Sequence, residues 1–192
     1  MKPHLLLFLL STAFYMLPAV LSSTAAAEPE GERVKTSLQV LYDFSSTSGP
    51  IIKDRSGAGK PVNLVIGGAN SVRRSEGSLE IHRKTLIQSG KEASRLIESI
   101  RRSGAVSIEA WIRPSNTTLD GPARIITLSE NSSNRNFTLG QERDRYVLRL
   151  RTTKTSANGQ PSLDSGNRTL SPVLTHVIYT RARRPRADLY QW

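Results

Sequence analysis

The sequence contains no cysteine, which excludes disulfide bonds, a cysteine-ligated metal site and a lipoprotein anchor. The fold must therefore be held together by its hydrophobic core. Histidine is nearly as scarce: apart from His4, only His82 and His176 are present, and their separation matches no zinc-ligand spacing. The Gly-x-Ser-x-Gly, Walker and dinucleotide-binding motifs are also absent from the sequence. The enzyme classes that these motifs mark are disfavoured.

Long apolar runs are confined to residues 5–21, which follow a basic start at Lys2. Small residues come next and end in three alanines, the last of which is Ala27. These are the three parts of a secretory signal peptide, so we expect residues 1–27 to be removed by cleavage after Ala27. The alternative is a membrane anchor, which Pro18 and the absence of a following basic cluster disfavour.

No later stretch is apolar over the roughly 20 residues that a bilayer span requires. We therefore expect a mature chain without a membrane span, either secreted or in the periplasm or cell envelope. Exported chains without cysteine are common in bacteria, which favours a bacterial envelope.

Acidic residues are the minority: 16 Asp and Glu stand against 27 Lys and Arg, for a formal net charge of +11. The basic residues cluster at 73–74, at 101–102 and in an arm over 181–186. Nucleic acid is one partner of such a surface, but the sequence has no nucleic-acid-binding module and its leader directs it elsewhere. An acidic polysaccharide or an anionic cell surface fits better. The alternative is that these arginines only form a solvated exterior.

The mature chain consists of short strand patterns separated by turns, after a polar lead-in at 28–36. In SLQVLYDF, residues 37–44, apolar side chains alternate and predict a half-buried strand. The further predicted strands are 63–66, 78–82, 105–114, 124–130, 136–142, 145–152, 175–181 and 187–190. His176 is expected to be a hydrogen-bonded strand residue. Several strands at this spacing predict one all-β domain, a sandwich or barrel, over residues 37–192.

One segment has helical periodicity instead, and predicts a short helix over residues 91–102 packed on the edge of the sandwich. Its apolar stripe consists of Leu96, Ile97 and Ile100. Ser89 and Glu92 have the spacing of a capping box at the start, and Gly104 is a helix-ending residue. We expect this helix to serve packing.

Two blocks of sequence resemble the laminin-G-like branch of the concanavalin A-like lectin and glucanase superfamily. The stronger block is SGAVSIEAWIRP at 103–114, and the second is the loop DRSGAG at 54–59. Weaker similarity extends from Leu38 to the C-terminus. The resemblance implies a jelly-roll β-sandwich of two antiparallel sheets, one of which is often concave and used for ligands.

Members of this superfamily often bind calcium through carboxylates and carbonyl groups of loops. The resemblance makes Asp54 the best candidate ligand, with Asp43 a distant second. The alternative is that Asp54 caps its own turn, as aspartate commonly does before a glycine-rich loop. No other cofactor is expected.

Glu109 is the residue on which an enzymatic activity would depend. Glucanases of the superfamily carry two or three acidic residues in alternation on one strand, because retaining hydrolysis needs two carboxyl groups about 5 to 5.5 Å apart. Side chains of a strand alternate between faces, so Glu109 shares a face with Ser107, Trp111 and Arg113. This face has a single carboxylate, while Val106, Ile108, Ala110 and Ile112 form the opposite, core-facing side. We therefore predict no catalytic residues.

The function that these observations favour is an exported, non-enzymatic module that binds a glycan or a surface protein. Trp111 and Tyr179 are the candidate platform residues for a sugar, and either could instead belong to the core. The alternative is a structural or protein-interaction module of a larger envelope protein. The third hypothesis is a glycoside hydrolase of the laminarinase type.

The C-terminus departs from the family pattern. The family continues past a strand such as 187–190 with a hairpin and further strands, whereas this sequence stops at Trp192. We expect the domain to be incomplete there, which would leave the strand at 37–44 without its usual neighbour unless another segment fills the gap. An unpaired edge of this kind would favour association between chains.

Overall fold

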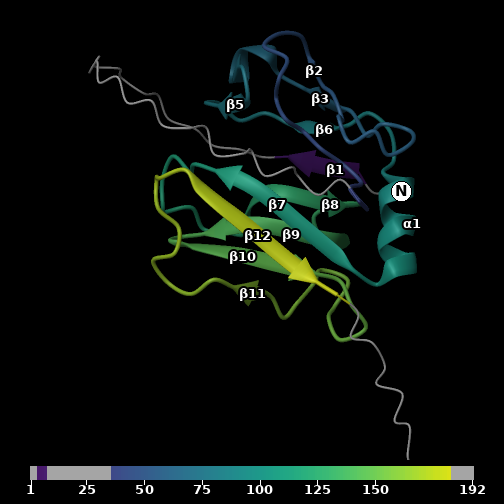
Figure 1. Ribbon diagram of the computed structural model, residues 1–192. Coiled ribbons are helices and arrows are strands. Elements are labelled where there is room, and N and C mark those ends of the chain that lie inside the picture. Colours follow the sequence, from purple (N-terminus) through teal and green to yellow (C-terminus); the bar gives the residue numbers. More distant parts are fainter. Residues whose placement is uncertain (1–3, 8–35, 183–192) are drawn as a thin grey trace, which may run out of the picture.

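The computed structural model describes residues 4–7 and 36–182 (Figure 1). The predicted cleavage point at Ala27, the basic arm beyond position 182 and the predicted strand at 187–190 lie outside the described residues. The strands are β1 His4–Leu7, β2 Ile51–Ile52, β3 Leu64–Ile66, β4 Val72–Ser75, β5 Ser78–Ile81, β6 Ile87–Ser89, β7 Val106–Ile112, β8 Ala123–Ser129, β9 Arg135–Glu142, β10 Arg145–Leu150, β11 Leu163–Asp164 and β12 Thr175–Arg181. The helices are the 3-10 turn η1 Ala69–Ser71 and the α-helix α1 Ser94–Ser103.

The strands form one large sheet and two small ones. The large sheet has eight strands in the order β11-β10-β9-β8-β1-β6-β3-β2, while β12 pairs with β7 and β4 pairs with β5. Every pairing is antiparallel. The predicted class, an antiparallel all-β fold with one short helix, is confirmed.

The β7–β12 pair lies across one face of strands β8 to β10, so the fold is layered in this region (Figure 1). The apolar face of β7 points into the space between the layers: Ile108 is 8% exposed and Ile112 is 2% exposed. They share one hydrophobic cluster with Leu128 of β8 and Leu139 of β9. The prediction that Ile108 and Ile112 face the core is confirmed.

The helix begins three residues later than predicted, and the prediction of a capping box at its start is wrong. The N-cap of α1 is Ala93, which makes no side-chain capping bond, because Ser89 is a buried residue at the end of β6. The other end is as predicted: Gly104 is left-handed, with φ 63°, and its N–H donates to the carbonyl of Ile100. The stripe of α1 packs on the core through partly buried residues, Leu96, Ile97 and Ile100. No helix of the described part of the chain is long and apolar enough to cross a membrane.

The segment 37–44 is not a strand, which corrects the prediction of an open sheet edge there. Val40, Tyr42 and Phe44 do pack against the core, as their alternation predicts. The backbone, however, is fixed by isolated bonds instead of a ladder. The N–H of Leu41 donates to the Asp54 carboxylate (3.1 Å), and the carbonyl of Leu41 accepts from Arg55 (2.8 Å). The outermost strands of the large sheet are β2 and β11, each two residues long.

The position of β1 is the least expected feature of the fold. Residues 4–7, which belong to the predicted leader, form a strand in the middle of the large sheet, between β6 and β8. Its register against β8 runs from His4 opposite Ser129 to Leu7 opposite Ile126. Residues 4–7 therefore share one hydrogen-bonded sheet with strands from the rest of the chain.

Candidate functional site

The outer face of the β7–β12 pair gathers the polar and aromatic side chains of both strands. Because side chains alternate along a strand, β7 presents Ser107, Glu109 and Trp111 on the side opposite to Ile108 and Ile112. In the ladder, His176 of β12 lies opposite Trp111. We call the outer face made by Ser107, Glu109, Trp111, His176, Ile178 and Thr180 the β7–β12 platform.

Trp111 is an exposed aromatic ring that is nevertheless held in one orientation. Its side chain is 57% exposed, and its ring stacks on the imidazole of His176 with centroids 4.4 Å apart and planes 3° apart. The Nε2 atom of His176 is in turn 3.0 Å from Oε1 of Glu109. Stacking and this polar contact together restrict the rotamers of both rings. A flat apolar surface is thus preorganised on the platform.

The predicted partner of Trp111, Tyr179, lies on the other side of the sheet. Tyr179 is registered with Ile108, an inward residue, and is partly buried against the core. The structure therefore brings Trp111 together with His176 and Glu109, and it separates Trp111 from Tyr179. The sequence prediction did not place His176 in the site, because the two rings are neighbours only through the register of β7 with β12.

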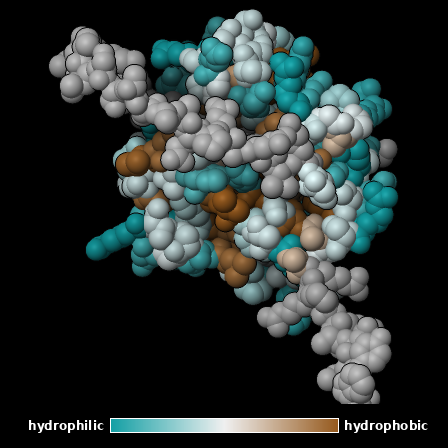
Figure 2. Space-filling model, in the orientation of Figure 1, coloured by the Kyte–Doolittle hydropathy of each residue, from teal (hydrophilic) through white to brown (hydrophobic). Residues whose placement is uncertain are grey.

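The platform also exposes an apolar side chain. Ile178, which is registered with Glu109, is 60% exposed. Figure 2, in the same orientation as Figure 1, shows hydrophobic residues gathered near the middle of this side of the molecule, over the β7–β12 pair. Exposed apolar surface that is bordered by polar groups is typical of an interaction site.

Glu109 contacts a histidine, and two other glutamates of the chain lie on different elements. The group that faces it is the imidazole of His176. Glu80 is on the β4–β5 hairpin, where it pairs with Arg73 (3.3 Å), and Glu130 follows β8 and lines a separate pocket. Among residues 36–182, no three His, Asp or Glu side chains are grouped so that they could hold a metal ion.

The candidate calcium ligand, Asp54, is surrounded by hydrogen-bond donors. Its Oδ1 accepts from the N–H groups of Ser56 (3.0 Å) and Leu41 (3.1 Å), and its Oδ2 accepts from the N–H of Val62 (3.0 Å). The guanidinium of Arg95 is 3.7 Å from Oδ2. Positive dipoles and a cation around a carboxylate stabilise its charge and oppose a second cation. These contacts are those of the turn-capping alternative.

The pKa of Asp54 reflects the same contacts. Burial by itself raises the pKa of this carboxyl, but the backbone donors Val62, Ser56 and Leu41 outweigh it and bring the pKa below its ordinary value. Asp43 is simpler: its Oδ1 accepts from the N–H of Ser45 (3.0 Å) at an exposed turn, and this bond is the main cause of its lowered pKa.

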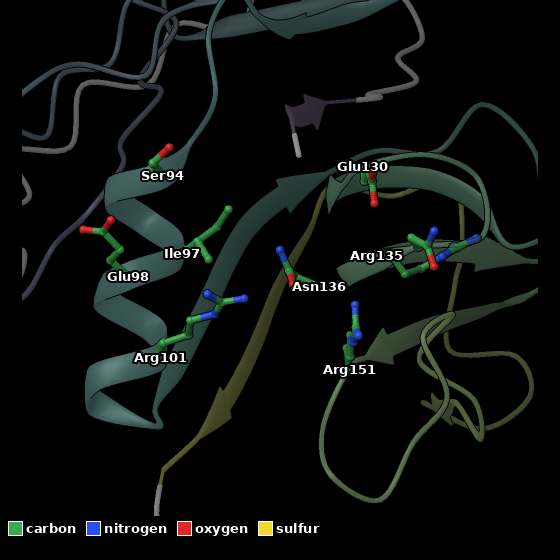
Figure 3. Close-up of a pocket in the computed structure, with 9 residues that line it drawn as sticks. Ser94, Ile97, Glu98, Arg101, Glu130, Arg135, Asn136 and Arg151 are labelled. Carbon is green, nitrogen blue, oxygen red and sulfur yellow. The ribbon is translucent and has the colours of Figure 1, made fainter. Parts of the chain in front are cut away.

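A hollow of about 340 Å³ lies between α1 and the strand ends at the start of β9 and after β10 (Figure 3). Arginines from three elements line it: Arg101 of α1, Arg135 of β9 and Arg151 after β10. Arg135 is 5% exposed, and its Nε has no hydrogen-bond partner among the described residues. Burial, together with repulsion from Arg124 and Arg149, lowers the pKa of Arg135 to about 10. The hollow therefore concentrates positive charge, and Glu98 and Glu130 border it.

Comparison of this chain with family models, with curated proteins and with solved structures found no match.

Proposed function

We propose that this protein is an exported, non-catalytic binding module whose β7–β12 platform binds a carbohydrate. The observation that carries the proposal is Trp111, which is more than half exposed and yet held by the stack with His176. An indole offers a flat apolar surface to the C–H face of a pyranose ring. Glu109 and the hydroxyl groups of Ser107 and Thr180 are on the same face and are suited to hydrogen bonds with sugar hydroxyls.

The fold that we propose for this module is a concanavalin A-like jelly-roll β-sandwich. Three observations support it: all strand pairs are antiparallel, the β7–β12 pair covers the large sheet, and the family-like block at 103–114 contains β7. Export through a leader cleaved after Ala27 is part of the same proposal. Without residues 1–27, which hold Lys2 and no acidic residue, the formal net charge is +10, and this charge favours an acidic glycan of a cell surface over a neutral one.

A glycan array followed by calorimetric titration with the best ligand tests the platform. Trp111→Ala removes the flat surface, and because aromatic residues at the centre of a site carry much of its affinity, we expect a loss of about tenfold or more. The matched control is Leu163→Ala, since Leu163 is a comparably exposed apolar residue (59%) on β11, outside the platform. We expect this control to bind as the wild type does. Equal affinities for Trp111→Ala and the wild type would contradict the proposal.

His176→Ala examines the orienting contact. This change leaves the indole in place and removes the ring that holds it, so we expect an affinity between that of the wild type and that of Trp111→Ala. Tyr179→Phe alters the inward face of β12 and should leave binding unchanged, because Tyr179 is not on the platform.

The second candidate function is a protein-interaction module, and Ile178 is the observation in its favour. A sugar that stacks on Trp111 gains little from contact with the aliphatic side chain of Ile178. A protein partner, by contrast, would bury both Trp111 and Ile178. Ile178→Ser therefore distinguishes the two functions. Glycan binding that survives this change supports the carbohydrate platform, and binding of a protein that needs both side chains supports the alternative.

A further inference from the structure

The large sheet is continuous because one short strand joins its two halves. β1 has β6 on one side, with Leu6 opposite Gln88, and β8 on the other, with Leu6 opposite Thr127. Adjacent strands of a sheet are about 4.8 Å apart, so β6 and β8 are separated by roughly 10 Å, too far to bond to each other. Without β1, the sheet order would contain a gap of one strand.

We propose that the space between β6 and β8 is an acceptor site for one extended peptide strand, filled by His4–Leu7 in the uncut chain. After the leader is cut, the site takes an apolar strand of the same chemistry, uncharged and free of proline, supplied by a separate polypeptide. This inference rests on the proposed cleavage after Ala27, but it concerns the interior of the large sheet and is independent of glycan binding by the platform.

The walls of this site are among the most buried parts of the protein. Ile87 and Ser89 of β6 are 0% and 2% exposed, and Thr127 and Leu128 of β8 are both 0% exposed. An empty site would leave N–H and C=O groups along both strands without partners in an apolar surrounding, which is unfavourable. The vacant sheet should therefore bind a strand tightly.

The most buried polar side chain of the β8 wall, Thr127, is already satisfied by its neighbours in the sheet. Thr127 donates from Oγ1 to the carbonyl of Phe137 (2.9 Å) and is 2.7 Å from Oγ1 of Thr138. Thr127 therefore needs no further partner from an incoming strand. The main requirement for that strand is a backbone that hydrogen-bonds on both sides. This is the chemistry of β-strand addition, with the difference that the strand enters between two edges and not beside one.

The leader is an occupant that the chain can lose. If it is cut after Ala27, His4–Leu7 is no longer covalently attached to the remaining domain, and only the ladders with β6 and β8 retain it. The proposal therefore predicts a non-covalent complex between leader and domain. It also predicts that another strand of similar chemistry can exchange with the leader.

The test uses the full chain with a specific protease site inserted after Ala27. The purified protein is cut under native conditions and passed over a gel-filtration column, and mass spectrometry measures how much of the 1–27 fragment remains with the domain. We expect retention in the wild type. Leu6→Pro removes an N–H at the position registered with both neighbours, so it should lower retention about tenfold or more. Leu10→Pro has the same composition but changes a residue outside β1, and it should behave as the wild type.

A second measurement does not depend on the variants folding. A labelled peptide with the sequence of residues 4–10, joined to a charged tag for solubility, is added to the cut protein, and a matched peptide carries an N-methyl group on Leu6. We expect the first peptide to displace the fragment and to protect the amides of β6 and β8 from hydrogen exchange, and the second to do neither.

Three results would overturn the proposal. The first is immediate release of the fragment without any loss of amide protection in β6 and β8. The second is equal loss of retention for Leu6→Pro and Leu10→Pro, which would indicate non-specific adhesion of an apolar peptide. The third is dimerisation of the domain on release of the fragment with no binding of the peptide, which would make a second copy of the chain the occupant.

Discussion

Replacement of Asp54 by alanine should destabilise the protein strongly, and more than replacement of Asp43, the other candidate aspartate. Three backbone N–H groups lose their acceptor: those of Leu41, Ser56 and Val62. Val62 is 7% exposed, so its N–H cannot be rehydrated easily, and leaving it unsatisfied costs about 1 to 3 kcal/mol. The other two donors are partly accessible and contribute about 0.5 to 1.5 kcal/mol each. The sum predicts a loss of about 2 to 6 kcal/mol in the free energy of unfolding.

The loss should extend beyond the loop, because Asp54 also positions residues 37–44. Without the bond from Leu41, the backbone that holds Val40 and Tyr42 against the core is less constrained. The matched control is Asp43→Ala, which removes an aspartate with one exposed backbone bond, to Ser45. We expect that change to cost no more than about 1 kcal/mol.

The assay is urea unfolding followed by circular dichroism, at neutral pH and again near pH 3. The pKa of Asp54 is lower in the folded state than in the unfolded chain, where it is about 3.9. The contribution of its charge is therefore fully present above that unfolded value and is lost as the pH falls through the folded pKa. The difference between wild type and Asp54→Asn, which has no titrating group at this position, should narrow near pH 3. Equal losses for Asp54→Ala and Asp43→Ala, or a difference that does not change with pH, would refute this account of the turn.

Three further predictions concern stability and use the same urea assay. Ile108→Ala should cost about 2 to 5 kcal/mol through lost burial and the cavity that remains, whereas Glu109→Ala, on the exposed face, should cost less than about 1 kcal/mol. Similar losses for both would mean that the face assignment of β7 is wrong. Arg135→Met removes a buried charge that is repelled by Arg124 and Arg149, but it also removes the hydrogen bonds from Arg135 to Thr138 (3.2 Å) and to the carbonyl of Ser132. The two effects oppose each other, so the free energy of unfolding should change by less than about 1 kcal/mol, and a loss above about 3 kcal/mol would contradict this. Gly159→Ala should cost about 1 to 3 kcal/mol more than Gly49→Ala. Both glycines have positive φ, but only at Gly159 would the added Cβ approach the backbone, 2.8 Å from the nitrogen of Leu150. Equal losses for the two variants would contradict this clash.

Much of the local structure follows from the sequence. The alternation in 105–114 correctly predicts which side of β7 is buried, since apolar residues at every second position are stable only with that face inward. Gly104 ends α1 because a residue without Cβ adopts the left-handed conformation at low cost. The alternative role for Asp54, as the cap of its own turn, also needs only local spacing, although its bonds to Leu41 and Val62 extend beyond the turn.

Three of the shortest strands were not predicted from the sequence. β2, β6 and β11 have two or three residues each, too few for a period of two to be recognised. The opposite error occurred at 37–44, where the alternation is clear and the residues pack as expected, yet no neighbouring strand completes a ladder. Alternation of apolar and polar residues indicates that one face of a segment is buried. It does not indicate whether a neighbouring strand is present to complete a ladder.

The composition of the site was decided by tertiary structure. In β12 both faces carry apolar residues, Val177 and Tyr179 on one and Ile178 on the other, so periodicity does not tell which faces the core. The register with β7 decides it, because Tyr179 lies opposite the buried Ile108. The same register stacks His176 on Trp111 although the two residues are 65 positions apart in the chain, and no local pattern connects them.

Placement of residues 4–7 is a tertiary outcome of the same kind. Their sequence alone indicates an apolar leader, since length, charge and small residues near Ala27 are all local properties. Their position between β6 and β8 depends on two strands more than 80 residues away along the chain, whose facing edges need hydrogen-bond partners that neither can supply to the other. The geometry of the gap selects a backbone that hydrogen-bonds on both sides, and no local pattern within residues 4–7 reveals that requirement.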